Sequence, residues 1–263
     1  MGMSHQLYPT DLTDDQWEDI RDLIPTAKSG GRPRTTDTRQ VMNAILYITV
    51  TGAQWRMLPR EYPPWQTVYS YFRTWMKDGT WERIHDTLRA RVRRKAGRHK
   101  HPTAGSLDSQ SVKASPWPGE RGYDAGKKIV GRKRHIVVDT LGLLMAVLVT
   151  PASVQDRDGA RLVLARLPAG AKKLRRLWVD GGYRGQLLNW AVTHCRVCLS
   201  VVLRSDDQRG FKVLPRRWVV ERTFAWIMAH RRLVRDHEAL PSTSQTFIQI
   251  AMTRIMLRRL VPT

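Results

Sequence analysis

The sequence has little cysteine, and what it has does not form a recognisable site. Cys195 and Cys198 make a single Cys-x-x-Cys after His194, and without a second pair they do not complete a zinc site. A redox role would need a thioredoxin-like context, which the surrounding sequence lacks. We therefore interpret both cysteines as ordinary buried or half-buried thiols.

Long apolar segments and internal repeats are also missing. The longest apolar run, residues 141–149, is far too short to span a bilayer, and the first residues do not resemble a signal peptide. These observations favour a cytoplasmic, nucleoid-associated protein that has neither a membrane nor a small-molecule substrate as its partner.

Acidic residues are scarce relative to basic ones. The chain has 23 Asp and Glu against 45 Lys and Arg, a formal net charge of +22 and a pI near 11.0. Such a balance favours nucleic acid over acidic proteins as the partner. Residues 1–50 have five basic and seven acidic side chains, whereas residues 51–100 have twelve and four. The first hundred residues are therefore a candidate region for DNA contact.

The first part of the chain has helical patterns. Thr13 and Gln16 predict a capping box at the start of a helix, and a second helix is expected from about Asp37 to Gly52. A third helix is expected over residues 65–77. This order has the outline of a helix-turn-helix module in which the third helix reads DNA.

The polar face of the third helix provides candidate DNA contacts, which are Gln66, Ser70, Arg73 and Lys77. A solvated amphipathic helix is the alternative, since surface helices commonly have a polar face. The surrounding positive charge favours DNA. In the basic stretch that follows, Arg93, Arg94 and Lys95 are expected to bind phosphate without reading sequence.

From Ser106 onwards the pattern changes to strands. We expect strands over residues 107–112, 128–139, 141–150, 174–180 and 198–203, and helices over residues 156–167, 186–194, 215–230 and 243–260. The fold class is therefore α/β, with a mixed five-stranded sheet flanked by helices. The expected division is an all-α domain over residues 1–88, a basic linker over 89–104 and the sheet domain over 105–263.

Three carboxylates stand beside apolar runs. Asp180 ends a strand and leads into a crossover, and ligands collect at such strand ends in open α/β sheets. Asp139 also ends an apolar run, but the hairpin turn that follows it is enough to explain an Asp at that position. Asp108 lies inside a strand, where hydrogen bonds or a cation must compensate it. Glu221 is expected on an apolar helix face, with Arg217 at i−4 as its ordinary partner. Singly, each is as well explained by structure as by function; jointly, they suit a two-metal site.

Longer motifs surround these carboxylates. They are residues 13–17, Gly52-Ala53-Gln54-Trp55-Arg56, residues 107–113, residues 131–135, Val179-Asp180-Gly181-Gly182-Tyr183 and residues 216–224. On these motifs, which extend over nearly the whole chain, the sequence resembles bacterial insertion-sequence transposases of the DDE type, in particular the insertion-sequence-five family. The resemblance implies a ribonuclease H-like catalytic domain and places Asp108, Asp180 and Glu221 on the catalytic carboxylates of the family.

The sequence departs from the family pattern near its last carboxylate. Related transposases have a Tyr, Arg, Glu, Lys series there, of which Arg217 and Glu221 match the middle. Leu214 and Met228 stand where Tyr and Lys are expected. The candidates for the missing cation are Arg231 and Arg232, one turn further on.

The resemblance implies a DNA transposase. It would bind the terminal inverted repeats of its element, cleave the ends by metal-dependent hydrolysis and join the 3′-hydroxyl to target DNA by transesterification. The implied cofactors are two Mg²⁺ ions, for which Mn²⁺ can substitute, held by Asp108, Asp180 and Glu221. Double-stranded DNA is the expected partner, and a homodimer is expected at least on DNA, because two element ends must be held together.

A second basic cluster consists of Lys127, Lys128, Arg132, Lys133, Arg134 and His135. We expect a strand that grips phosphate near the first Asp. The alternative is a solvated hairpin face, and strand alternation lets only half of these residues point one way. Arg217 and Arg222 complete the expected DNA contacts.

Two other functions stay open at this point. One is a sequence-specific DNA-binding regulator or inactive domesticated transposase, which loss of a carboxylate would mark; all three are present. The other is a structure-specific nuclease of the ribonuclease H fold, such as a junction resolvase. Specific binding to an inverted repeat would separate a transposase from a resolvase.

Overall fold

The computed structural model describes residues 8–26, 35–116, 119–203 and 217–262. The α-helices in these ranges are α1 (Asp14–Glu18), α2 (Thr38–Thr51), α3 (Trp65–Lys77), α4 (Thr80–Lys95), α5 (Asp156–Leu164), α6 (Gln186–Trp190), α7 (Trp218–Met228), α8 (Arg231–Val234) and α9 (Pro241–Leu260). Short 3-10 helices are formed by Arg21–Leu23, Trp55–Met57, Ala169–Lys173 and Gly181–Tyr183, and a π-helix by Ala191–Cys195. None of these helices is both long and apolar enough to cross a bilayer.

The strands are β1 (Ala104–Lys113), β2 (Gly122–Asp124), β3 (Ile129–Asp139), β4 (Leu144–Pro151), β5 (Arg176–Val179) and β6 (Cys198–Val201). The sheet order is β2-β3-β1-β5-β6, and β4 pairs with β3 as well. Since β2 and β4 pair with successive parts of the same edge of β3, the sheet is five strands wide. β1, β5 and β6 are parallel, and β3 is antiparallel to β1. The mixed sheet confirms the expected fold class, and β2 is an addition to it.

Local signals set the ends of the first helices. Thr13 Oγ1 accepts a hydrogen bond from the backbone N–H of Gln16, and the Gln16 side chain accepts one from the N–H of Thr13, as the capping box predicts. Gly52 ends α2 with φ +75°, and a Cβ there would lie 3.2 Å from the backbone N of Arg232. Only glycine suits both the left-handed conformation and this close approach.

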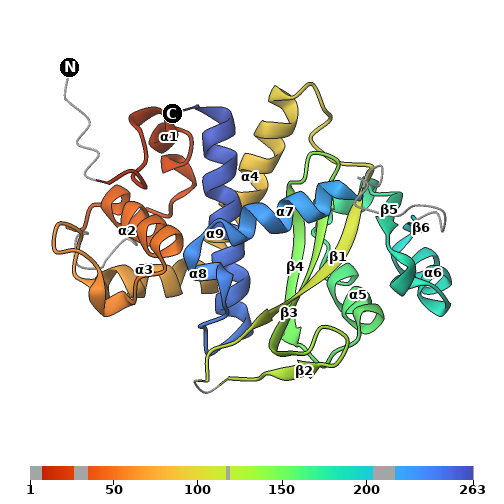
Figure 1. The fold of residues 1–263 in the computed structure, drawn as a ribbon. Helices are drawn as coiled ribbons and strands as arrows, with labels where there is room; N and C mark the ends of the chain where they lie inside the picture. Colours follow the sequence, from red (N-terminus) through yellow and green to blue (C-terminus); the bar gives the residue numbers. More distant parts are fainter. Residues whose placement is uncertain (1–7, 27–34, 117–118, 204–216, 263) are drawn as a thin grey trace.

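Two apolar cores lie on opposite faces of the sheet. Ile136 and Val138 on β3 point into a core shared with α2, α3, α4, α7 and α9, whereas Val137 points toward α5 and the segments after β5. This division follows the two-residue alternation of a strand. Figure 1 shows α9 standing between the N-terminal helices and the sheet.

The two parts of the chain are closely joined. α4 continues to Lys95, so the boundary predicted between residues 88 and 89 falls inside a helix, and the segment without helix or strand begins at Ala96. The connection from α2 to α3 spans residues 52–64, longer than the short turn of a helix-turn-helix. The domain division and the helix-turn-helix assignment therefore stay predictions.

Candidate active site

Asp108 and Asp180 come from neighbouring parallel strands. β1 pairs with β5 so that Ser106 lies opposite Trp178. Asp108 is two residues further along β1. Asp180 comes directly after β5, two residues beyond Trp178, and its backbone is still extended, so the two-residue alternation directs both side chains to the same face of the sheet. The Asp180 carboxylate is held by the N–H of Gly182, which donates to Oδ1 at 2.8 Å.

Glu221 reaches this place from α7. This helix packs against β1 and β3, as Figure 1 shows, and buries Val219, Val220 and Phe224. The Glu221 side chain is 49% exposed. The expectation that Glu221 lies on the apolar face was therefore wrong, because the buried face of α7 is formed by other positions.

One guanidinium nitrogen lies between the three carboxylates. Nη2 of Arg217 is 3.7 Å from Asp108 Oδ2, 3.9 Å from Asp180 Oδ2 and 3.7 Å from Glu221 Oε1. Since all three oxygens lie within 3.9 Å of one atom, any two of them are separated by less than twice that distance. The structure thus brings together the three carboxylates that the sequence singled out, with Arg217 as a partner of all three rather than of Glu221 alone.

Asp108 is the carboxylate with the most perturbed environment. Burial raises its pKa to about 6, and the neighbouring Asp180 adds to this increase. The N–H of Ser109, which donates to Asp108 Oδ1 at 2.7 Å, and the charges of Arg217 and Lys127 act in the opposite direction. Burial and the charge of Asp180 thus outweigh the hydrogen bond and the two positive charges that favour the ionised form.

The donor chemistry of this site fits hard divalent ions, since carboxylate oxygens are the ligands that Mg²⁺ prefers. Within the described residues, however, no three His, Cys, Asp or Glu side chains are grouped closely enough to hold an ion as they stand. The Arg217 guanidinium takes the place of a cation between the carboxylates. Metal binding would require this side chain to move aside.

A polar layer that the sequence reasoning missed lies beneath Asp108. Ser109 Oγ donates to Asp156 Oδ1 at 2.7 Å, and Lys133 Nζ lies 3.0 Å from the same oxygen. Tyr183 is buried beside these groups, and burial together with the charge of Asp108 raises its pKa well above the ordinary value. Ser109 and Tyr183 both lie in the motifs around the carboxylates, but their sequence positions do not reveal these contacts.

The basic cluster on β3 corrects a prediction. Arg132, Lys133, Arg134 and His135 are all buried, so they do not form a phosphate-gripping surface. Arg132 pairs with Asp236 at 3.2 Å, and Lys133 with Asp124 at 3.3 Å in addition to Asp156. Burial lowers the pKa of His135 to about 4, so its ring is neutral near pH 7. Only Lys127 and Lys128, on the turn before β3, are exposed.

Two further expected DNA contacts are corrected in the same way. Arg93 is buried and forms an ion pair with the buried Asp139. Arg232 is buried, pairs with Glu238 at 2.7 Å and donates to the carbonyl of Ala53 at 3.0 Å. Both side chains have partners inside the protein instead of a phosphate.

The other expected DNA contacts have side chains that reach the surface at least in part. They are Gln66, Ser70, Arg73, Lys77, Arg94, Lys95, Lys127, Lys128, Arg217, Arg222 and Arg231. Of these, Arg222 lies over the rings of Trp218 and Trp226 at 4.2 and 4.5 Å. That the residues in this list contact DNA stays a prediction. Leu214, which stands where the family pattern has Tyr, lies outside the described residues.

Two family profiles match the chain. Residues 99–256 match the profile described as "Transposase DDE domain", and residues 12–85 match "Putative transposase of IS4/5 family (DUF4096)". This chain belongs to the DDE transposase family. The ribonuclease H-like class of its sheet follows from that membership.

The chain is also similar to three curated proteins, one of which is named as a transposase. The "Putative transposase for insertion sequence element IS402" of Burkholderia cepacia is 30% identical over 110 residues, 39% of this chain and 52% of the relative. The "Insertion element IS402 uncharacterized 16.2 kDa protein" of the same organism is 30% identical over 110 residues, 73% of its length. The "Uncharacterized protein y4sN" of Sinorhizobium fredii is 34% identical over 68 residues, 26% of this chain and 54% of the relative. The chain thus spans about half the length of two of these relatives.

Proposed function

We propose that this DDE transposase binds the terminal inverted repeats of an insertion sequence, cleaves the DNA at the element ends and joins the freed 3′-hydroxyl to target DNA. The observation that supports this function most directly is the convergence of Asp108, Asp180 and Glu221 on the one nitrogen of Arg217. Three carboxylates from two strands and a helix suit metal-assisted phosphoryl transfer.

The three carboxylates would hold two Mg²⁺ ions, or Mn²⁺ in their place. When bound, the ions supply charge that stabilises the attacking and leaving oxygens of an in-line displacement. Asp108 and Asp180 would hold their ligand oxygens on one face of the sheet, fixed by the N–H groups of Ser109 and Gly182. Glu221, which is half exposed on α7, would supply the third carboxylate.

Arg217 has two tasks in this proposal. Without divalent ions it reduces the repulsion between the carboxylates, which its nitrogen approaches within 4 Å. With divalent ions at the carboxylates, the guanidinium would be free to bind a DNA phosphate next to the scissile bond, because its fork of donors matches phosphate oxygens. The exposed Lys127 and Lys128, on the turn before β3, would bind other phosphates of the DNA.

The test is cleavage of a labelled duplex that contains the end of the parent element, with Mg²⁺ and with EDTA. We expect cleavage at the element boundary that needs the metal and is lost in Asp108→Asn, Asp180→Asn and Glu221→Gln, while binding of the duplex is kept. Asp158→Asn is the matched control, since Asp158 is an exposed carboxylate of α5. Cleavage by any of the three site variants would contradict the assignment.

Binding without cleavage would point elsewhere. If the protein binds the element end tightly and does not cut it with any divalent metal ion, the regulator or inactive-transposase function is favoured. If it cuts branched DNA regardless of sequence, a structure-specific nuclease is favoured. Light scattering of the complex with the element end would test the expected dimer on DNA.

A further inference from the structure

A cleft lined by aromatic and basic side chains lies outside the carboxylate site. Its volume is about 450 Å³. One wall consists of Gln54, Trp55, Arg56, Trp65, Tyr69 and Arg73, and the other of Arg232, residues 237–240 and Thr243. We call it the aromatic cleft. It contains Trp55 and Arg56, which belong to a motif that the catalytic proposal does not use.

The aromatic wall is anchored in the core and open on one side. Trp55 packs edge-on against Tyr69 with ring centroids 5.2 Å apart, and Phe72 lies behind it at 5.3 Å. Tyr69 is 37% exposed, although it is a large ring. The guanidinium of Arg56 lies 5.7 Å from the centre of the Trp65 ring. Rings fixed from behind and accessible in front are the surfaces on which nucleic acid bases stack.

The charge of the cleft is positive. Arg56 is exposed and Arg73 is half-buried, and within the described part of the chain neither forms an ion pair. Arg232 contributes little, because Glu238 lies 2.7 Å away and balances it. Two uncompensated guanidinium groups beside aromatic rings favour a planar ligand that is anionic.

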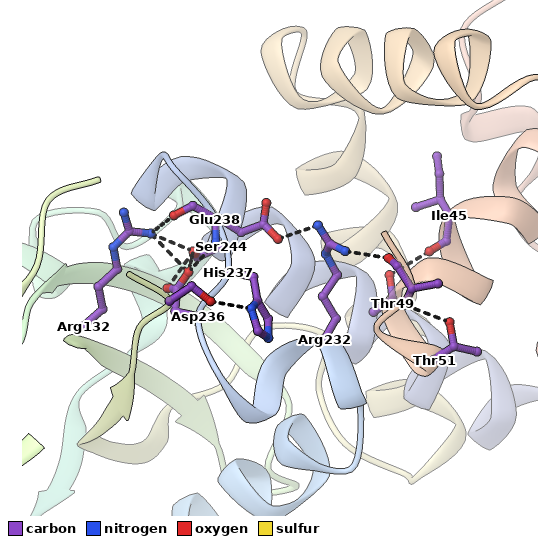
Figure 2. A network of polar contacts seen from close by, with 11 residues as sticks. Ile45, Thr49, Thr51, Arg132, Arg232, Asp236, His237, Glu238 and Ser244 are labelled. Carbon is purple, nitrogen blue, oxygen red and sulfur yellow. Dashed lines mark hydrogen bonds and ion pairs between the residues drawn. The ribbon is translucent and has the colours of Figure 1, made fainter. Parts of the chain in front are cut away.

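The second wall is held in place by the polar network of Figure 2. Arg132, from β3, donates hydrogen bonds of 2.8 Å to the carbonyls of both Glu238 and Ala239. On the other side, Arg232 joins Glu238 to the carbonyl of Ala53. The network ties this wall to the sheet and to the segment before Trp55. The cleft is therefore preformed, and the two buried arginines that do not reach DNA act as its scaffold.

We propose that the aromatic cleft binds an unpaired nucleotide of the DNA substrate. Its base would stack on Tyr69 and the two tryptophans, and its phosphate would lie between Arg56 and Arg73. A volume of about 450 Å³ is in the range of small-ligand sites, about 300–1,000 Å³, and has no room for a duplex. The proposal rests on the proposed function only in taking DNA as the ligand.

The experiment compares the affinity of the protein for a blunt duplex with that for the same duplex carrying a short single-stranded thymidine overhang. Fluorescence anisotropy in EDTA measures binding without cleavage. We expect the overhang to tighten binding about tenfold, as stacking of one or two bases does. Arg56→Ala and Tyr69→Ala should remove this preference while leaving affinity for the blunt duplex within about twofold.

Matched controls separate the cleft from general charge. Arg60→Ala removes an exposed arginine four positions from Arg56, and Tyr123→Ala removes an exposed tyrosine on β2; both should keep the tenfold preference. Thermal melting checks that each variant is folded. Equal affinity of the unsubstituted protein for the two duplexes, or a preference that survives in Arg56→Ala, would overturn the proposal.

Two outcomes distinguish this proposal from the proposed function. An overhang preference in a protein that cleaves no DNA would support the cleft and contradict the transposase activity. Cleavage without an overhang preference would support the transposase activity and contradict the cleft proposal. Displacement of the overhang duplex by an acidic peptide as readily as by an oligothymidine would overturn the nucleotide assignment, because a peptide satisfies the arginines without using the rings.

Discussion

Asp108 is a candidate catalytic carboxylate whose ionisation opposes folding. Its pKa of about 6 lies above the ordinary value near 3.8, so the folded protein binds its proton more tightly than the unfolded chain. Stability should therefore fall as the pH rises from about 4 to about 6 and remain lower above that, by up to about 3 kcal/mol. The loss is the consequence of burying the Asp108 carboxylate, to which the neighbouring Asp180 adds.

Asp108→Asn should accordingly stabilise the metal-free protein. In EDTA at pH 7.5 we expect its free energy of unfolding to exceed that of the unsubstituted protein by up to about 3 kcal/mol, whereas at pH 4 the two should nearly agree. Urea unfolding at both pH values measures this difference. Asp158→Asn, on an exposed residue, should show no such dependence. A stability difference that is the same at both pH values would contradict the pKa argument.

Neighbouring arginines at the end of α4 have opposite roles. Arg93 is paired with Asp139 inside the protein, whereas Arg94 is exposed. Arg93→Ala leaves a buried carboxylate without its partner and should destabilise folding by about 3–5 kcal/mol. Arg94→Ala should leave stability unchanged and weaken DNA binding. Urea unfolding and anisotropy titrations on both variants give the comparison, and a stability loss in Arg94→Ala would contradict it.

β3 shows where sequence reasoning succeeded and where it failed. The strand, its hairpin with β4 and the alternation of its side chains were predictable from the β-branched residues and the Asp139 turn. The burial of Arg132 and Lys133 was not, because Asp236, the partner of Arg132, comes from a distant part of the chain, and Asp124, the partner of Lys133, lies on β2, a strand that the sequence did not predict. A basic residue is normally exposed, and only the tertiary fold shows which ones are neutralised.

The three carboxylates were predictable for a related reason. Each stood beside an apolar run, and Asp108 inside one strand and Asp180 at the end of its parallel neighbour can meet on one face of the sheet, as they do. The face of Glu221 was not predictable, because α7 has apolar residues on both its buried and its exposed sides, with Trp218 still 39% exposed. Periodicity alone gives no preference between two such faces.

The exposed positive charge of the second basic cluster lies on the turn before β3 and not on the strand itself. Lys127 and Lys128 are both exposed there. The double variant Lys127→Ala with Lys128→Ala should weaken binding to any duplex and reduce the slope of log affinity against log salt by about two, since each phosphate contact contributes about 0.9. Anisotropy titrations over a range of salt concentrations measure the slope. The pair Lys172→Ala with Lys173→Ala, also exposed, should leave it unchanged.

The whole molecule is organised around α9. Its buried residues Phe247, Met252 and Met256 belong to the same core as Ile45 of α2 and Trp75 of α3, although nearly two hundred residues separate them in the sequence. Figure 1 shows this helix between the N-terminal helices and the sheet. The N-terminal helices therefore complete their core only with the C-terminal end of the chain.

An N-terminal fragment of residues 1–95 should consequently fail to fold alone. Without α9 it exposes the side chains that Phe247 and its neighbours cover, and a fragment of this size buries a smaller share of its surface than a longer chain does. We expect no cooperative thermal transition by circular dichroism, and recovery of one when a peptide of residues 241–262 is added. The same peptide with Phe247→Asp should not restore it, because it places a charge in the core. A cooperative transition of the fragment alone would instead establish the N-terminal helices as an independent domain, as the sequence had suggested, and α9 would then be a docking element and not a part of their fold.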